Sequence, residues 1–229
     1  MDEKTVVRRG YVMDEKTVVR RGYDDLGATW SEKSADEAGQ ALDAVLGALP
    51  GDARVLDAGC GDGVPVLDRL AEESEAVGLD LSGELLALAG ERVPAAALAQ
   101  GDMAALPFAD GVFDAVVAFY SLIHVPRAEH LATIEEFARV LSPGGTLLVT
   151  EGAEEWTGTN PDWLDADVTM HWEMAGPEAT RDQLRDAGFS IRREWGVPDT
   201  LGDDGEGEDD ASKVFFLATL TDGGAPDRV

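Results

Sequence analysis

Short apolar segments that suit β-strands alternate with amphipathic helical segments from Arg54 to Glu151, and this alternation restricts the fold more than any other feature. Strands are predicted at residues 54–58, 75–80, 96–100, 112–120 and 146–150, and helices at 35–49, 65–73, 82–92 and 127–141. Strand–helix–strand units of this kind join parallel strands through right-handed crossovers. This part of the chain therefore predicts a parallel sheet with helices on both faces.

The C-terminal part loses this regular alternation. A helix is predicted at 177–188 and two closing strands at 190–195 and 214–220, with the acidic run 202–210 between them. We interpret that run as an exposed loop, with a cation site as the alternative. The expected fold class is α/β: a Rossmann-like, doubly wound, seven-stranded sheet that is mostly parallel and has an antiparallel C-terminal hairpin.

A direct repeat occupies the first 23 residues, because Met1 to Tyr11 and Met13 to Tyr23 both read MDEKTVVRRGY. Repeat architectures need at least about three units of 20 or more residues. We interpret the two copies as a tandem duplication or an ambiguity of the start site. Residues 1–12 are expected to be dispensable and disordered, and residues 13–229 to form a single domain with a mobile cap insertion at about 151–176.

The first predicted strand runs into the loop Asp57-Ala58-Gly59-Cys60-Gly61-Asp62-Gly63. Glycine permits positive φ there and removes side chains that would keep a ligand from the backbone. Asp80 ends the second strand, where Rossmann-like folds place a carboxylate on ribose hydroxyls. A tight turn and a helix-capping aspartate are the alternatives. The glycine spacing favours S-adenosylmethionine (SAM) over a dinucleotide, because a dinucleotide loop aims a helix N-terminus at a pyrophosphate that SAM lacks.

Several stretches occur in the order found in class I SAM-dependent methyltransferases. They are Val55–Gly63, Gly78–Ser82, Gln100–Met103 with Leu106–Phe108 and Phe113–Asp114, and Leu141–Gly145. Residues 23 to 152 therefore resemble the small-molecule members of this family, in particular the ubiquinone/menaquinone-biosynthesis-like group. The C-terminal part resembles the family only in its outline of helix and strands.

The resemblance implies a role for each matching residue on the methionine side of SAM. Asp57 would support the loop and the amino group, directly or through water. Gly59 and Gly61 would face the methionine portion. Cys60 would be a small loop filler next to the cofactor, because no base that could activate its thiol is visible nearby.

The nucleoside half of SAM would meet residues from three strand ends. By the same resemblance, Asp80 would hold the ribose and Leu81 would pack against adenine. Asp102 would accept a hydrogen bond from the adenine amino group, with Met103 beside the ring. Phe119 would lie where the backbone meets the cofactor.

Methyl transfer is an in-line displacement with a neutral leaving group, so the protein needs alignment and in some cases a base. Tyr120 and His124 follow the fourth strand, at the edge where α/β proteins bind ligands, and are the catalytic candidates. His124 is the candidate base, since a neutral imidazole titrates near working pH; a histidine that only holds a loop is the alternative. His130 is expected on an exposed helix face, and His171 within reach of the pocket.

Aromatic residues outside the strands have two interpretations each. Tyr23 and Trp30 belong to an N-terminal segment that often covers SAM in the family, so they form part of a lid or act as packing anchors. Trp156, Trp163 and Trp172 line an acceptor pocket or fill the core of the cap.

The charge balance is strongly acidic, with 46 Asp and Glu residues, 18 Lys and Arg residues and a net charge of −28. We interpret it as the acidic surface of a halophilic protein, with an acidic mesophilic protein as the alternative. It argues against nucleic-acid binding. The absence of an apolar run of about 18 residues argues against a membrane span, and the single cysteine and lack of a signal peptide favour the cytoplasm. No metal site is expected: the sequence has no Cys/His cluster, which disfavours a zinc-assisted mechanism, and a magnesium site built from carboxylates is the alternative.

The expected function is therefore SAM-dependent methyl transfer to a small-molecule acceptor, with S-adenosylhomocysteine as the product. The alternative is a catalytically silent SAM-binding module with a regulatory or assembly role. An NAD-type dehydrogenase is disfavoured by the glycine spacing. Neither the acceptor nor the oligomeric state can be read from the residues.

Overall fold

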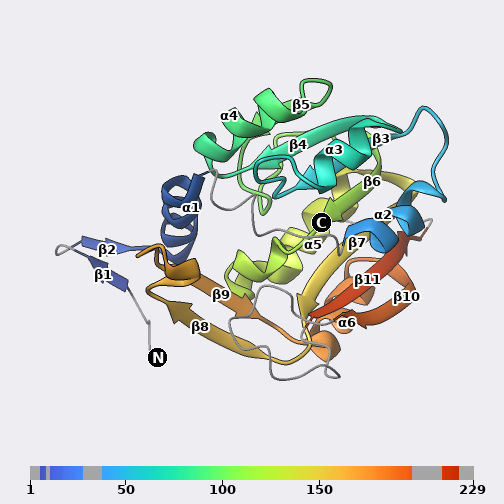
Figure 1. Ribbon diagram of the computed structural model, residues 1–229. Helices are drawn as coiled ribbons and strands as arrows, with labels where there is room; N and C mark the ends of the chain where they lie inside the picture. The colour runs from blue at the N-terminus through green and yellow to red at the C-terminus, as the bar shows by residue number, and fades with distance from the viewer. Residues whose placement is uncertain (1–5, 9–10, 28–37, 198–212, 222–229) are drawn as a thin grey trace.

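A seven-stranded sheet forms the centre of the computed structural model, which describes residues 6–8, 11–27, 38–197 and 213–221 (Figure 1). The spatial order is β10-β11-β7-β6-β3-β4-β5. In chain order these strands are β3 (Arg54–Ala58), β4 (Glu75–Asp80), β5 (Ala97–Gln100), β6 (Phe113–Ala118), β7 (Leu141–Gly152), β10 (Phe189–Val197) and β11 (Lys213–Leu220). Strands β3 to β7 pair in parallel, and β11 runs antiparallel to both β7 and β10. The predicted fold class is confirmed.

Helices cover both faces of the sheet. Helices α2 (Ala38–Leu46) and α3 (Val66–Ala71) pack on one face, and α5 (His130–Val140) and α6 (Pro177–Asp186) on the other. Helix α4 (Gly83–Arg92) packs against β4 and β5. The result is the doubly wound, three-layered arrangement that the alternating segments predict.

Strand β6 shows how one apolar run supplies two cores. Val116 and Ala118 pack toward α5 and α6, whereas Ala115 and Val117 pack toward α2 and α3, and all four are fully buried. A central parallel strand is covered on both faces, so its sequence is apolar without alternation. Each fully buried valine side chain contributes about 1.5–3 kcal/mol by leaving water.

Some predicted boundaries differ from the observed ones. The predicted helix at 127–141 begins as a 3₁₀ turn at Arg127–Glu129 and becomes α-helical at His130. The predicted turn at 142–145 is the irregular start of β7, where Gly144 has φ of 79° and the pairing with β6 shifts register. The predicted N-cap of α4 is confirmed, because Ser82 Oγ accepts a hydrogen bond from Leu85 N at 3.0 Å.

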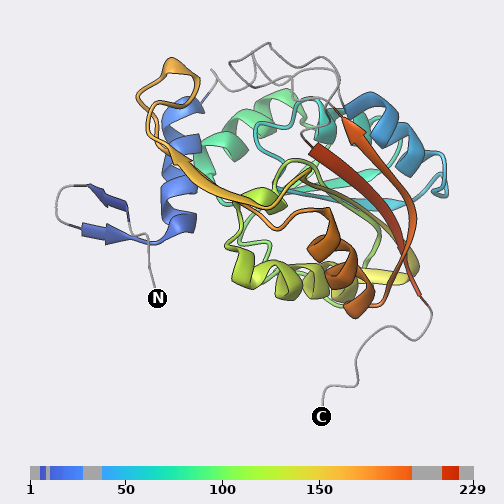
Figure 2. The same ribbon diagram turned by 90° about the horizontal axis from the view of Figure 1, so that it is seen from below.

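The cap is a β-ribbon. Glu151 and Gly152, which were expected in the cap, are the last residues of β7. The chain then forms β8 (Trp156–Asn160) and β9 (Met170–Met174), which pair antiparallel around a 3₁₀ turn at Trp163–Asp165. Figures 1 and 2 show this ribbon beside helix α1 (Glu15–Leu26), and the two are in contact.

The two copies of the N-terminal repeat have different structures. The described part of the first copy forms β1 (Val6–Arg8) and the start of β2 (Tyr11–Met13), an antiparallel ribbon that projects away from the sheet (Figure 2), although disorder is predicted there. The second copy forms α1, which begins after Asp14, whose side chain accepts from Thr17 N at 2.8 Å. Among the described residues, no helix is long and apolar enough to cross a membrane.

His130 is fully buried, so its predicted position on an exposed helix face is wrong. Helix α5 begins at His130, and this starting point turns the imidazole toward the protein interior. There His130 Nε2 lies 3.0 Å from the Val125 backbone oxygen, and Nδ1 lies 3.6 Å from Glu151 Oε2. Glu151 accepts from Gly152 N at 2.7 Å and from the Thr180 hydroxyl at 3.2 Å. Burial raises the pKa of Glu151 to about 7 and lowers the pKa of His130.

Replacing Glu151 by Gln is expected to flatten the pH dependence of stability. Because its pKa rises from 4.5 in the unfolded chain to about 7 in the folded chain, the folded state holds the proton more tightly. The protonated carboxyl therefore contributes fully below pH 4.5, and on the order of 3 kcal/mol is lost as the pH rises toward 7.

Urea unfolding between about pH 5 and 7.5 measures this change. His130, whose pKa shifts downward, contributes a trend of the opposite sign that the wild type and the variant share. Glu178→Gln removes an exposed carboxylate of α6 and should keep the wild-type slope. A Glu151→Gln variant whose free energy of unfolding falls as steeply as that of the wild type would contradict the assignment.

Candidate functional site

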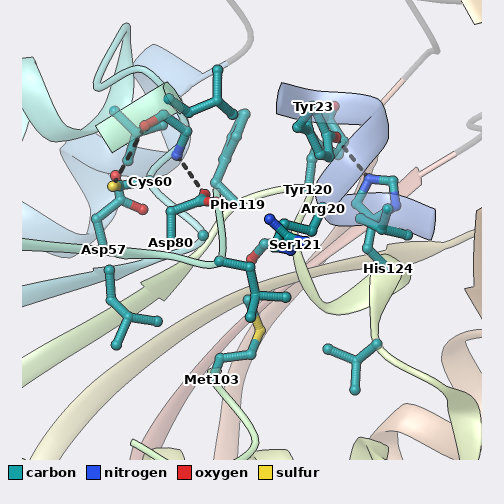
Figure 3. A pocket seen from close by; sticks show the side chains of 18 of the residues that line it. Arg20, Tyr23, Asp57, Cys60, Asp80, Met103, Phe119, Tyr120, Ser121 and His124 are labelled. Carbon is teal, nitrogen blue, oxygen red and sulfur yellow. Dashed lines mark hydrogen bonds between the residues drawn. The ribbon is translucent and has the colours of Figure 1, made fainter. Parts of the chain in front are cut away.

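One pocket opens at the carboxyl ends of β3, β4 and β6, below helix α1 (Figure 3). The structure brings all the predicted site residues to its wall. They are Tyr23, Asp57, Gly59, Cys60, Gly61, Asp80, Leu81, Asp102, Met103, Phe119, Tyr120 and His124. The predicted site residues therefore form one continuous surface.

Asp57 is a buried carboxylate without a hydrogen-bond donor. Its side chain is 1% exposed, and neither oxygen has a partner among the described residues. Burial and the nearby charge of Asp80 raise the pKa of Asp57 well above its usual value. An isolated buried carboxylate is costly, and a ligand that brings a cationic N–H group would remove that cost.

The glycine loop keeps its backbone close to the pocket. Gly59 and Gly61 have φ of 86° and 56°, the left-handed region that glycine enters without steric cost. A Cβ at Gly59 would lie 2.4 Å from the Ser121 Cβ, and Ser121 Oγ in turn donates to the Ala58 backbone oxygen at 2.6 Å. A side chain at position 59 would therefore displace the loop from the end of β6.

Asp80 links the loop to the next helix. Its Oδ2 accepts from Gly61 N at 2.9 Å and its Oδ1 accepts from Ser82 N at 2.8 Å. Burial raises the pKa of this carboxyl, and these backbone donors oppose the shift. Since a carboxylate oxygen has further acceptor capacity, Asp80 can also accept from hydroxyl groups of a ligand.

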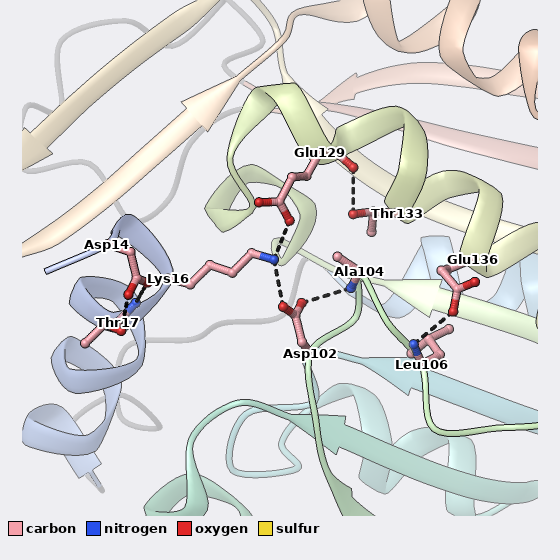
Figure 4. A network of polar contacts seen from close by, with 9 residues as sticks. All are labelled: Asp14, Lys16, Thr17, Asp102, Ala104, Leu106, Glu129, Thr133 and Glu136. Carbon is pink, nitrogen blue, oxygen red and sulfur yellow. Dashed lines mark hydrogen bonds and ion pairs between the residues drawn. The ribbon is translucent and has the colours of Figure 1, made fainter. Parts of the chain in front are cut away.

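Lys16 is a pocket residue that no sequence motif indicates. Its Nζ donates to Asp102 Oδ2 at 2.7 Å and to Glu129 Oε2 at 2.5 Å, and Asp102 Oδ1 accepts from Ala104 N at 2.9 Å (Figure 4). The helical spacing could have indicated it. The side chains that share one face of α1 all line the pocket, namely Lys16, Val19, Arg20 and Tyr23.

His124 and Tyr23 form a hydrogen-bonded pair between the 3₁₀ turn Leu122–His124 and α1. His124 Nδ1 lies 3.0 Å from the His171 backbone oxygen, so we assign the ring hydrogen to Nδ1. His124 Nε2 then accepts from the Tyr23 hydroxyl at 2.9 Å. Burial lowers the pKa of His124 to about 4 and raises that of Tyr23, so both groups are neutral near pH 7.

The aromatic residues of the cap lie behind this pair and do not line the pocket. Trp163 packs edge-on against Tyr23 at 5.8 Å between ring centroids, and Trp172 lies 5.8 Å from the His124 ring. Trp156 is 48% exposed. Of the two interpretations of Trp163 and Trp172, the geometry favours the cap core. Trp30 lies outside the described residues.

Comparisons with known proteins agree with this geometry. A family described as a methyltransferase domain matches residues 55–145, from β3 into β7. A demethylmenaquinone methyltransferase of Beutenbergia cavernae is 43% identical over 168 residues, which are 70% of this chain and 65% of that protein. One of Mycobacterium sp. (strain KMS) is 43% identical over 109 residues, 47% of this chain and 45% of that protein. From β3 into β7 the chain is therefore similar in sequence to methyltransferases.

Solved structures show the same fold as this chain. The [4+2]-cyclase SpnF superposes with a TM-score of 0.67 at 23% identity over 88% of this chain and 94% of that chain. Magnesium protoporphyrin IX methyltransferase of Synechocystis, solved with bound SAM, superposes with a TM-score of 0.66 at 22% identity over 92% of this chain and 99% of that chain. At these identities the likeness shows the fold alone. The chain spans between about half and two thirds of the length of the curated relatives above.

Proposed function

We propose that this methyltransferase transfers the methyl group of SAM to a small-molecule acceptor of the quinone class, in its reduced, hydroxyl-bearing form. The observation that carries the proposal is the placement of Asp57, Asp80 and Asp102 around one pocket, in the order of the polar groups along SAM. The acceptor class is supported by the relatives, which are named for demethylmenaquinone.

The pocket residues fit SAM group by group. The Asp57 carboxylate, buried without a donor of its own, suits the ammonium of the methionine part. Asp80 suits the vicinal hydroxyls of the ribose, and Asp102 the adenine amino group. SAM, when bound, supplies an electrophilic methyl group on a sulfonium whose departure leaves a neutral thioether. The protein then has to align the acceptor and take up a proton.

His124 and Tyr23 are positioned to take that proton. The Tyr23 hydroxyl donates to His124 Nε2, so its oxygen can accept a hydrogen bond from a hydroxyl of the acceptor. As the acceptor loses its proton to the Tyr23 oxygen, the Tyr23 proton passes to His124 Nε2. The His171 carbonyl, 3.0 Å from Nδ1, stabilises the imidazolium that results. Tyr120 also lines this pocket and is proposed to orient the acceptor.

Removing the carboxylate of Asp80 is expected to weaken cofactor binding. A hydrogen bond to a charged group contributes about 1.5–3 kcal/mol, so Asp80→Ala should bind S-adenosylhomocysteine about tenfold to a hundredfold less tightly. Titration calorimetry measures the affinity, with NAD as a ligand that should not bind. Asp80→Asn tests the same loss while keeping one acceptor for the Gly61 N–H, and Asp186→Ala, exposed at the end of α6, is the control. Unchanged affinity in both Asp80 variants would refute the ribose assignment.

Removing the Tyr23–His124 pair is expected to lower turnover without weakening cofactor binding. His124→Ala should reduce kcat with a reduced naphthoquinone and labelled SAM by about a hundredfold or more, and Tyr23→Phe should reduce it as well. Because the pKa of His124 is about 4, the wild-type rate should be constant from about pH 6 to 8 and fall only when the ring is protonated at lower pH.

The repeat provides a matched control for this test. Tyr11→Phe makes the same change at the equivalent residue of the first copy and should leave kcat unchanged. Full activity of His124→Ala would eliminate it as the base. A wild-type protein that binds S-adenosylhomocysteine but methylates no reduced quinone would contradict the proposed acceptor and favour the silent module.

We further infer that the protein works in a salt-rich cytoplasm and does not bind nucleic acid. The support is the net charge of −28. At low ionic strength the acidic side chains repel one another and also repel phosphate backbones. The Tm is therefore expected to rise as KCl is increased from about 0.1 M to 2 M, since salt screens this repulsion. A Tm that stays constant or falls over this range would contradict salt adaptation.

A further inference from the structure

Three possible metal ligands meet where α1 contacts β9, outside the pocket wall. Glu15 comes from the first turn of α1, and His171 and Glu173 from one face of β9. One ligand atom from each lies within 4.8 Å of the other two. We propose that these residues bind one divalent transition-metal ion, of the class that Zn²⁺ represents.

The separations of the ligand atoms suit a shared ion. His171 Nε2 lies 3.3 Å from Glu173 Oε1 and 3.9 Å from Glu15 Oε1. Neighbouring ligands of a tetrahedral ion with bonds of about 2.0–2.2 Å lie about 3.3–3.6 Å apart. Small side-chain adjustments would therefore complete the coordination, and water would fill the remaining position.

A second set of contacts orients the ligands. His171 is 5% exposed, and its Nδ1 lies 3.0 Å from the Thr159 hydroxyl oxygen. When Nδ1–H donates to this oxygen, the lone pair of Nε2 points to the two carboxylates, which is the arrangement of a metal-bound histidine. Glu173 is held as well, because its Oε2 accepts from Arg127 N at 2.6 Å.

The electrostatics of the cluster favour a cation. Burial and the charge of Glu173 raise the pKa of Glu15. Among the described residues, neither Glu15 nor Glu173 forms an ion pair with a lysine or arginine. A metal ion between the two carboxylates would offset their mutual repulsion. The imidazole donor favours zinc-like ions over Mg²⁺, which prefers oxygen ligands alone.

The position of the cluster indicates that the ion would join helix α1 to strand β9. Glu15 belongs to the helix that carries Lys16 and Tyr23 over the pocket. The backbone oxygen of His171 accepts from His124 Nδ1. An ion shared by Glu15 and His171 would hold the helix on the ribbon β8–β9 and the His171 carbonyl behind His124, without touching a substrate.

Metal titration of the full chain tests the site directly. Chelator-treated wild-type protein is titrated with ZnCl₂ by calorimetry, and with MgCl₂ in parallel. One Zn²⁺ per chain is expected, with far weaker Mg²⁺ binding. Glu15→Gln and Glu173→Gln should each weaken Zn²⁺ binding by more than about tenfold, the loss that even an outer-shell partner causes. Asp25→Asn, an exposed residue of the same helix, is the matched control and should bind as the wild type does.

Thermal unfolding gives a second measurement. Zn²⁺ that binds the folded chain should raise the Tm of the wild type and of Asp25→Asn, and raise it less in the two glutamate variants. Equal Zn²⁺ affinity in all four proteins would overturn the site. So would a wild type that binds no Zn²⁺ in the calorimetric titration. Neither readout uses a methyl donor or acceptor, so failure here would leave the proposed acceptor untouched.

Discussion

The unpaired carboxylate of Asp57 is the interaction on which the site depends. Three backbone N–H groups of the loop that follows it bond elsewhere. Gly59 N and Cys60 N donate to the Leu79 backbone oxygen, and Gly61 N donates to Asp80. Asp57 is therefore buried beside a second carboxylate, in a position that suits the cationic group of a ligand. In the proposed function, the ammonium of SAM would take this position and offset the cost of burying the carboxylate.

The N-terminal repeat shows how tertiary context decides local structure. The same eleven residues include a strand where Val7 belongs to the projecting ribbon and form a helix where Val19 is buried against the cap. Intrinsic propensity is equal in the two copies, so burial against β9 and the polar contacts of Lys16 select the helix. A further contact, from Ser82 Oγ to Asp24 at 2.6 Å, joins α1 to the N-terminus of α4. Helix α1, which covers the pocket, is consequently held by hydrogen bonds and ion pairs as well as by apolar packing.

Much of the fold and of the cofactor side of the pocket could be predicted because it depends on local patterns. The strand at 75–80 and the cap of the next helix at Ser82 follow from residues adjacent in sequence. Long-range pairing could not be predicted in the same way. The ribbon β8–β9 has no periodicity of its own, and the inward direction of His130 depends on the residue at which α5 begins. The contacts of Lys16 could not be predicted from the sequence because its partners lie 86 and 113 residues away along the chain.

The structure also changes the reason for considering His124 as a base. The sequence argument rests on an imidazole that titrates near neutral pH, whereas burial keeps this ring neutral down to about pH 4. Such a ring is a weak base in the absence of ligand, and its basicity must come from its surroundings. The His171 carbonyl fixes the tautomer and favours the charged form, and Tyr23 separates Nε2 from the pocket. In the proposed mechanism, proton uptake by His124 would therefore depend on the position of α1, since this helix carries Tyr23.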